Sequence, residues 1–97
     1  MRRFALVFVL ALAACASSHD PITAVYDCAN GQRLDVVFEP GQAIITTENG
    51  TMATLEQQPA ASGFWYKADQ YNQELRGKGR DATWKPRWRR ATTCRAR

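Results

Sequence analysis

Few residues of this 97-residue chain have the types and spacing that catalysis needs. The single histidine, His19, stands alone in a short polar stretch, and no Cys/His cluster has the spacing of a zinc site. There is no glycine-rich phosphate loop. Ser62 and Lys78 form one formal Ser–Lys nucleophile pair, but so small a chain leaves little room for an enclosed pocket with an oxyanion hole. The sequence therefore predicts a protein that is not an enzyme and that uses no metal or cofactor.

Two short segments hold the residues best suited to binding. Residues 61–66 read ASGFWY, and residues 77–82 read GKGRDA. The hydroxyl of Ser62 and the ammonium of Lys78 can both make directed polar contacts. Taken separately, each segment is also compatible with an ordinary solvated turn.

Phe64, Trp65 and Tyr66 are consecutive aromatic residues. In a strand they cannot all face one core, because successive side chains point to opposite faces. We therefore expect at least one of these rings to be exposed, and an exposed aromatic ring is a candidate for an interface.

The N-terminus has the pattern of an export signal. Two arginines precede an uninterrupted apolar run, Phe4–Ala14. A spanning helix needs about 20 apolar residues, so the run predicts a signal peptide over residues 1–14 instead. Leu12–Cys15 (LAAC) resembles the lipobox of bacterial lipoproteins, whose cysteine is acylated and becomes the mature N-terminus. Ala16 stands where an Asp would direct retention in the inner membrane, so the resemblance implies an outer-membrane lipid anchor on Cys15, facing the periplasm.

The cysteines predict one disulfide in one small domain. Residues 15–21 read as the lipidated end and a tether, which leaves a domain over residues 22–97, near the size at which a hydrophobic core alone is marginal. Lipidation of Cys15 leaves Cys28 and Cys94 as the pair that can form a bridge in an oxidising compartment. This bridge would close a loop of nearly 70 residues and contribute about 4 kcal/mol.

The domain reads as short strands separated by turn signals such as Asn30-Gly31 and Asn49-Gly50. No stretch shows a helical period. The expected strands are 23–28, 34–38, 43–47, 51–56, 64–67, 74–77, 81–85 and 88–94. Seven or eight short strands predict an all-β fold, a small antiparallel barrel or a sandwich. A disulfide from the first strand to the last favours the barrel.

The two binding segments, taken with the strand and cysteine pattern, resemble a known family. The sharpest parts are S-G-x-x-Y (Ser62, Gly63, Tyr66) and K-G-x-[ED]-A (Lys78, Gly79, Asp81, Ala82). Residues 25–28, 34–38 and the closing Cys94 extend the resemblance over the whole mature domain. The family is the membrane-bound inhibitors of c-type lysozyme, whose members are small antiparallel β-barrels with one disulfide.

The resemblance implies competitive occlusion of the lysozyme cleft. Lys78 would pair with the ionised catalytic carboxylate, and Ser62 would hydrogen-bond the acid carboxyl. Gly63 and Gly79 would let the backbone approach the cleft walls, and Tyr66 would stack or buttress. In this sequence the stretch from Tyr66 to Lys78 is about two residues longer than the family pattern, which puts the reach of Lys78 in doubt.

The basic segment Lys85–Arg90 (KPRWRR) has no place in the family pattern. Residues 15–66 hold one base and six acids, whereas residues 67–97 hold ten bases and three acids. Because c-type lysozymes are themselves usually cationic, like charges should slow encounter unless the acidic half faces the enzyme. The asymmetry supports an alternative function, a structural lipoprotein that binds an anionic envelope polymer such as lipopolysaccharide core. Nucleic acid is not expected as a partner outside the cytoplasm.

Overall fold

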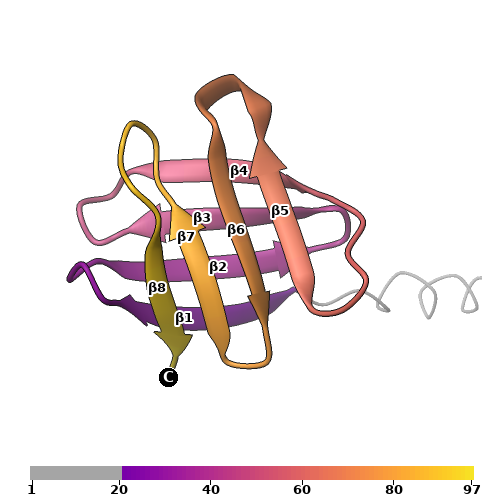
Figure 1. The fold of residues 1–97 in the computed structure, drawn as a ribbon, viewed down its shortest axis with the longest axis horizontal. Coiled ribbons are helices and arrows are strands. Elements are labelled where there is room, and N and C mark those ends of the chain that lie inside the picture. The colour runs from indigo at the N-terminus through magenta and orange to yellow at the C-terminus, as the bar shows by residue number, and fades with distance from the viewer. Residues whose placement is uncertain (1–20) are drawn as a thin grey trace, which may run out of the picture.

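Eight antiparallel strands form a closed barrel in which each strand pairs with the next and β8 returns to β1 (Figure 1). The computed structural model describes residues 21–97, so the expected signal peptide and the lipidated Cys15 lie outside the described residues. The strands are β1 (Ile22–Cys28), β2 (Arg33–Glu39), β3 (Gln42–Thr47), β4 (Met52–Gln57), β5 (Phe64–Ala68), β6 (Gln73–Lys78), β7 (Asp81–Lys85) and β8 (Thr92–Ala96). A single 3-10 turn, η2 (Asp69–Tyr71), joins β5 to β6. The predicted all-β barrel of eight strands is confirmed.

The core follows from the alternation of side chains along the strands. The inward-facing residues of every strand meet in one apolar cluster: Tyr26, Cys28, Leu34, Val36, Ala43, Ile45, Leu55, Tyr66, Leu75, Ala82, Trp84 and Cys94. The largest of these, Trp84, is 1% exposed. The outward-facing residues between them are mostly polar or charged, as a single-layer barrel requires.

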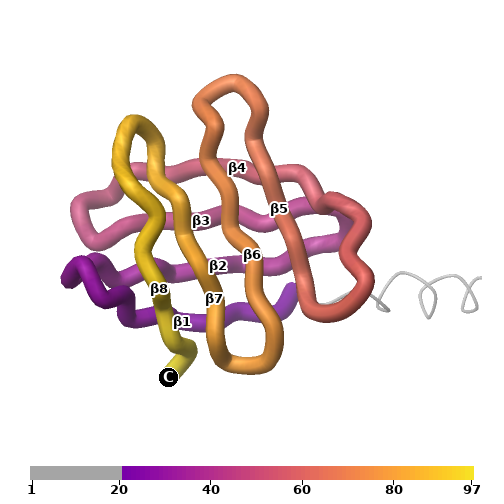
Figure 2. The backbone as a smooth tube through the Cα atoms, viewed as in Figure 1, coloured from indigo at the N-terminus to yellow at the C-terminus, as the bar shows by residue number. Residues whose placement is uncertain are grey.

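The barrel consists of two four-stranded halves that cross one another (Figure 2). The half β1–β4 runs across the back of the view, and the half β5–β8 runs steeply over its front (Figure 1). The two seams between the halves are short. Two register pairs join β4 to β5, and three join β1 to β8, whereas β1 and β2 share six.

A disulfide closes the β1–β8 seam. Cys28 and Cys94 are register partners and are bonded to one another, as predicted. Beside them, Arg97 donates two hydrogen bonds to the Asp27 carboxylate, at 2.8 and 3.1 Å. The short ladder between the first and the last strand is therefore reinforced by a covalent bond and an ion pair.

The Asn-Gly turns form as expected, although only the glycine takes a positive φ. Gly31 has a φ of 92° and Gly50 a φ of 88°, while Asn30 and Asn49 stay in the usual region. In each turn the glycine N–H donates 2.9 Å to the carbonyl oxygen three residues earlier. Such three-residue hairpin loops, a turn followed by one left-handed residue, are a common alternative to the two-residue loop.

The last strand differs from the prediction. It was expected over residues 88–94 and lies at Thr92–Ala96. Pro86 cannot donate to a ladder, and Trp88 has a φ of 61°, so the chain turns there before β8 begins. No helix within residues 21–97 is long and apolar enough to cross a membrane.

Candidate functional site

Ser62 and Lys78 line the same open hollow on the barrel surface, with a volume of about 510 Å³. Ser62 lies in the loop that joins β4 to β5, and Lys78 ends β6 at the turn into β7. Both segments lie at the lower edge of the molecule in Figure 1. The remainder of the hollow is lined by Arg76, Gly77, Asp81, Ala82, Thr83, Thr93 and Cys94. The fold therefore brings together the two segments that the sequence singled out.

Gly63 sets the distance between these two segments. It has a φ of 72°, and a Cβ atom placed on it would lie 2.1 Å from the Gly77 carbonyl oxygen and 3.1 Å from Lys78 Cα. No other residue type fits both the conformation and the space. The family resemblance implied that Gly63 allows close approach to a partner, but the structure accounts for this glycine by a contact inside the molecule.

A second glycine, Gly77, had no role in the sequence analysis beyond its place in a strand. Gly77 is the register partner of Phe64, and a Cβ atom on it would lie 2.6 Å from Phe64 Cζ. The Phe64 ring therefore covers the glycine, an arrangement that stabilises a strand at a residue without a side chain. The close approach could have been predicted from the sequence, because a glycine inside a strand often marks a place where another group comes near the backbone.

The turn that carries Lys78 is short and braced. Lys78 and Asp81 are register partners, so Gly79 and Arg80 form a two-residue loop, with Gly79 at a φ of 62° and nothing within 4 Å of its added Cβ. Arg80 donates from Nη2 and Nε to the Ala96 carbonyl oxygen, at 2.8 and 3.2 Å. These bonds tie the turn to β8 and limit its movement. Nothing in the sequence pattern had indicated this role for Arg80.

The polar groups of Ser62 and Lys78 are free for a partner. Both residues are exposed, and among the described residues neither side chain makes a hydrogen bond or an ion pair. The carboxylate nearest along the chain, Asp81, is bound by Arg95 at 2.9 Å. No hydrogen bond joins Ser62 to Lys78 within residues 21–97, and no group of three potential metal ligands occurs there.

Tyr66 lies in the core beneath this edge and is 6% exposed. Its ring centroid is 5.6 Å from that of Phe38 and 6.0 Å from that of Phe64, and burial raises the pKa of its phenol. A buried ring cannot stack on a partner, so of the two roles expected for Tyr66 only buttressing agrees with its position.

The expectation that one of the three consecutive aromatics is exposed is wrong. Trp65 points outward from the barrel, but the Arg76 guanidinium lies 4.5 Å from its ring centroid and its indole N–H donates to Glu74. Phe64 and Tyr66 face inward and pack on one another. The neighbouring strand β6 thus covers the outward ring. The exposed aromatic of the described residues is Trp88, at 78%.

The long connection between Tyr66 and Lys78 does not alter the register at this edge. The strands β5 and β6 pair from Phe64 with Gly77 to Ala68 with Gln73. The chain reverses at η2 and at Asn72, which has a φ of 54°. This reversal lies at the end of the β5–β6 hairpin that is opposite to Lys78.

Comparison with protein-family models gives one match. The family of membrane-bound lysozyme inhibitors of c-type lysozyme matches residues 26–92. The chain belongs to this family. Searches of curated proteins and of solved structures return no match.

Family membership makes the protein an inhibitor of c-type lysozyme and not an enzyme. The matched region extends from the middle of β1 to the first residue of β8 and so includes both segments of the hollow. The resemblance seen in the sequence is therefore confirmed at the level of the family.

Proposed function

We propose that the inhibitor occludes the catalytic cleft of c-type lysozyme with the edge formed by Ser62 and Lys78. A retaining lysozyme holds two carboxyl groups about 5–5.5 Å apart across the scissile bond, one protonated and one ionised. The Lys78 ammonium pairs with the ionised carboxylate in a charge-assisted hydrogen bond. The Ser62 hydroxyl bonds the acid carboxyl, because a hydroxyl can donate or accept as the proton on that group demands.

The observation that carries this proposal is the shared hollow with its two unpaired side chains. Ser62 and Lys78 come from different loops, and the close packing of Gly63 on Gly77 fixes the spacing between the backbones of these two loops. Arg80 and the Cys28–Cys94 bridge hold the same edge from the side of β8. An edge that is rigid before binding loses little conformational entropy when it binds.

We also propose that the inhibitor is anchored in the outer membrane through acyl chains on Cys15 and faces the periplasm. The support is the lipobox-like segment Leu12–Cys15 and Ala16 after it. Two or three acyl chains give a stable anchor, since each buried methylene contributes about 0.8 kcal/mol. The mass of the mature protein tests this proposal: it should begin at an acylated Cys15, and an unmodified cysteine or a start at another residue would contradict it.

Inhibition by purified residues 16–97 tests the contacts in the cleft. Removing one partner of a desolvated charge pair costs about 2–5 kcal/mol, so Lys78→Ala should raise the inhibition constant about 30-fold or more. Ser62→Ala removes one hydrogen bond of about 0.5–1.5 kcal/mol and should raise it about 2- to 10-fold.

The matched control is Lys67→Ala, which removes a lysine from β5 whose Nζ lies 3.6 Å from Asp69. It should inhibit as the wild type does, and all three variants should keep the wild-type circular dichroism spectrum. If Lys78→Ala is no weaker than Lys67→Ala, the cleft contacts are wrong. If micromolar wild type leaves cell-wall lysis untouched, this chain lacks the activity of its family.

A further inference from the structure

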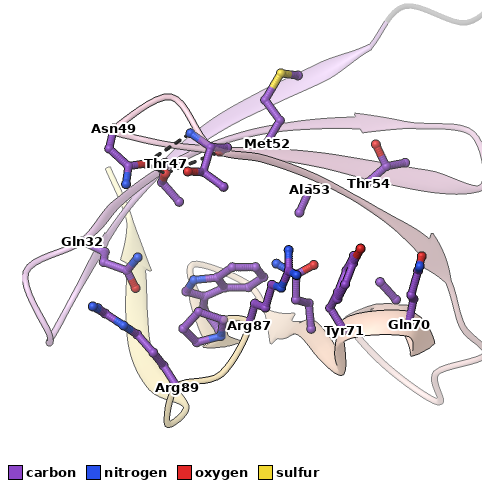
Figure 3. A pocket seen from close by; sticks show the side chains of 15 residues that line it. Gln32, Thr47, Asn49, Met52, Ala53, Thr54, Gln70, Tyr71, Arg87 and Arg89 are labelled. Carbon is purple, nitrogen blue, oxygen red and sulfur yellow. Dashed lines mark hydrogen bonds between the residues drawn. The ribbon is translucent and has the colours of Figure 1, made fainter.

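A second hollow, of about 440 Å³, lies at the end of the barrel away from Ser62 and Lys78 (Figure 3). Four connections meet there: the β1–β2 turn with Gln32, the β3–β4 turn with Asn49, the β5–β6 turn with Tyr71, and the β7–β8 connection with Arg87 and Arg89. In Figure 1 the β5–β6 and β7–β8 turns stand at the top, whereas the edge that carries Lys78 is at the bottom. The volume of this second hollow is within the range of small-molecule binding sites.

The hollow is positively charged. Its lining includes Arg87 and Arg89 and no carboxylate. The acids of the adjoining turns are engaged elsewhere: Glu48 accepts from the backbone N–H of Arg33 at 3.3 Å, and Asp69 lies 3.6 Å from Lys67 Nζ. The two guanidinium groups therefore favour an anion.

Arg87 is held in place before any ligand arrives. Its guanidinium lies 3.7 Å from the centroid of the Tyr71 ring and 5.4 Å from that of Trp88. Stacking on an aromatic face leaves the edges of a guanidinium, where its N–H groups point, free to bind a carboxylate or phosphate. In Figure 3 Arg87 and Tyr71 stand side by side below the strand that carries Met52 and Ala53.

Trp84 supplies an independent sign of a ligand. It lines the hollow, is 1% exposed, and its Nε1 is the one buried side-chain nitrogen or oxygen without a partner in residues 21–97. Leaving such a donor unsatisfied is unfavourable, and native structures rarely do so without a reason. A ligand in the hollow can supply the missing acceptor once the side chains that cover this nitrogen shift.

Trp88, beside the hollow, is in an unusual conformation. A bulky residue at a φ of 61° is strained, and this one is also 78% exposed, so it gains little burial in return. Strain of this kind is found mainly at sites of binding or catalysis. The indole ring of Trp88 lies next to the Arg87 guanidinium.

We propose that this hollow binds an acidic oligosaccharide, a sugar chain that carries carboxylate or phosphate groups. Arginines take the charge, and the amides of Gln32, Asn49 and Gln70 with the threonine hydroxyls of the lining bond to the sugar hydroxyls. A lipid surface fits less well, because Met52 is the one large hydrophobic residue of the lining that is exposed. The inhibitor thereby binds an envelope glycan at one end while its other end stays free for lysozyme.

The test uses the indole N–H signals of ¹⁵N-labelled residues 16–97, one each from Trp65, Trp84 and Trp88. Three probes are added: a carboxylate-bearing muropeptide, a phosphorylated and delipidated lipopolysaccharide core, and neutral chitotetraose. The signals of Trp84 and Trp88 should shift and saturate with at least one acidic probe. The Trp65 signal should not shift, because its N–H already donates to Glu74. The acidic probe that binds more tightly identifies the source of the glycan.

Variants separate this site from the lysozyme-binding edge. Arg87→Ala/Arg89→Ala should weaken binding of the acidic probe at least 10-fold and should not weaken lysozyme inhibition. The charge-matched control Arg95→Ala/Arg97→Ala, in and just after β8 at the other end of the barrel, should keep wild-type binding of the probe. Equal affinity for chitotetraose, no saturable shift of Trp84, wild-type affinity in Arg87→Ala/Arg89→Ala, or tighter binding to anionic phospholipid vesicles would each overturn the proposal.

Discussion

Gly63 is the residue on which the geometry of the lysozyme-binding edge depends. Its φ is 72°, and a Cβ atom added to it would lie 2.1 Å from the Gly77 carbonyl oxygen, so no side chain fits there. We expect Gly63→Ala to lower the free energy of unfolding by about 2–5 kcal/mol, since a left-handed alanine costs about 1–2 and an overpacked contact about 1–3. Urea denaturation measures the loss. Any folded fraction should inhibit lysozyme less well, because the Ser62 loop must move away from Lys78.

Gly79→Ala is the matched control for that variant. Gly79 has a similar φ, 62°, but an added Cβ would have nothing within 4 Å. Gly79→Ala therefore costs only the strain of a left-handed alanine, and it should lower the free energy of unfolding by about 1–2 kcal/mol. Equal losses for the two variants would mean that the contact between Gly63 and Gly77 is not tight in solution.

At the scale of the elements, the β1–β8 seam is where the barrel closes. Three register pairs alone would hold it, but the Cys28–Cys94 bridge spans the same strands and closes a loop with a sequence separation of 66 residues. Reduction should therefore lower the free energy of unfolding by about 4 kcal/mol. Urea denaturation with and without reductant measures this. A Cys28→Ala/Cys94→Ala variant should match the reduced wild type and be insensitive to reductant, and a loss below about 1 kcal/mol would contradict the role of the bridge.

The ion pair at the same seam makes stability depend on acid pH. The hydrogen bond from Arg97, aided by the charges of Arg97 and Arg33, holds the pKa of the Asp27 carboxyl below 3.8. Because the folded pKa is lower than the unfolded one, the stabilisation is present above pH 3.8 and is lost as the pH falls through the folded pKa.

Urea midpoints between pH 6 and pH 2 test this dependence. The decline at acid pH should be smaller in Asp27→Asn and in Arg97→Gln than in the wild type. The difference in acid sensitivity between the wild type and the two variants should shrink at high salt, because the side chains of Asp27 and Arg97 are both exposed. An identical decline in all three proteins would show that Asp27 does not contribute.

At the scale of the whole molecule, one group of basic residues lies away from the edge that carries Ser62 and Lys78. The ten bases of residues 67–97 include Arg89 and Arg90 in the exposed β7–β8 connection, away from Ser62 and Lys78. Because c-type lysozymes are usually cationic, we expect this connection to repel the enzyme during encounter without contacting it in the proposed complex. Arg89→Gln/Arg90→Gln should therefore speed association a few-fold at low ionic strength.

Stopped-flow association rates across a salt series measure this repulsion. The rates of the variant and of the wild type should converge as salt rises, since the screening length falls to about 3 Å at 1 M, and the dissociation rate should stay the same. Slower association of the variant would mean that the basic connection faces an acidic part of lysozyme.

Much of the fold of this protein could be predicted from local patterns in the sequence. Alternation, β-branched residues and Asn-Gly turns are short-range signals, so seven strands were placed to within two residues. The Cys28–Cys94 disulfide could be predicted from the number of cysteines alone, without knowing which residues lie in contact. The segments of Ser62 and Lys78 were recognisable because each motif lies within a few consecutive residues.

Only the tertiary structure decided the features that depend on residues far apart in the chain. The burial of Tyr66, the cover of Trp65 by Arg76, and the contact of Gly63 with Gly77 all arise from pairing between β5 and β6. The start of β8 depended on Trp88, whose left-handed conformation no propensity predicts. The second hollow joins four turns that share no sequence motif. Short-range patterns specify strands and turns, but which side chains meet is set by the closure of the barrel, and that is a property of the whole chain.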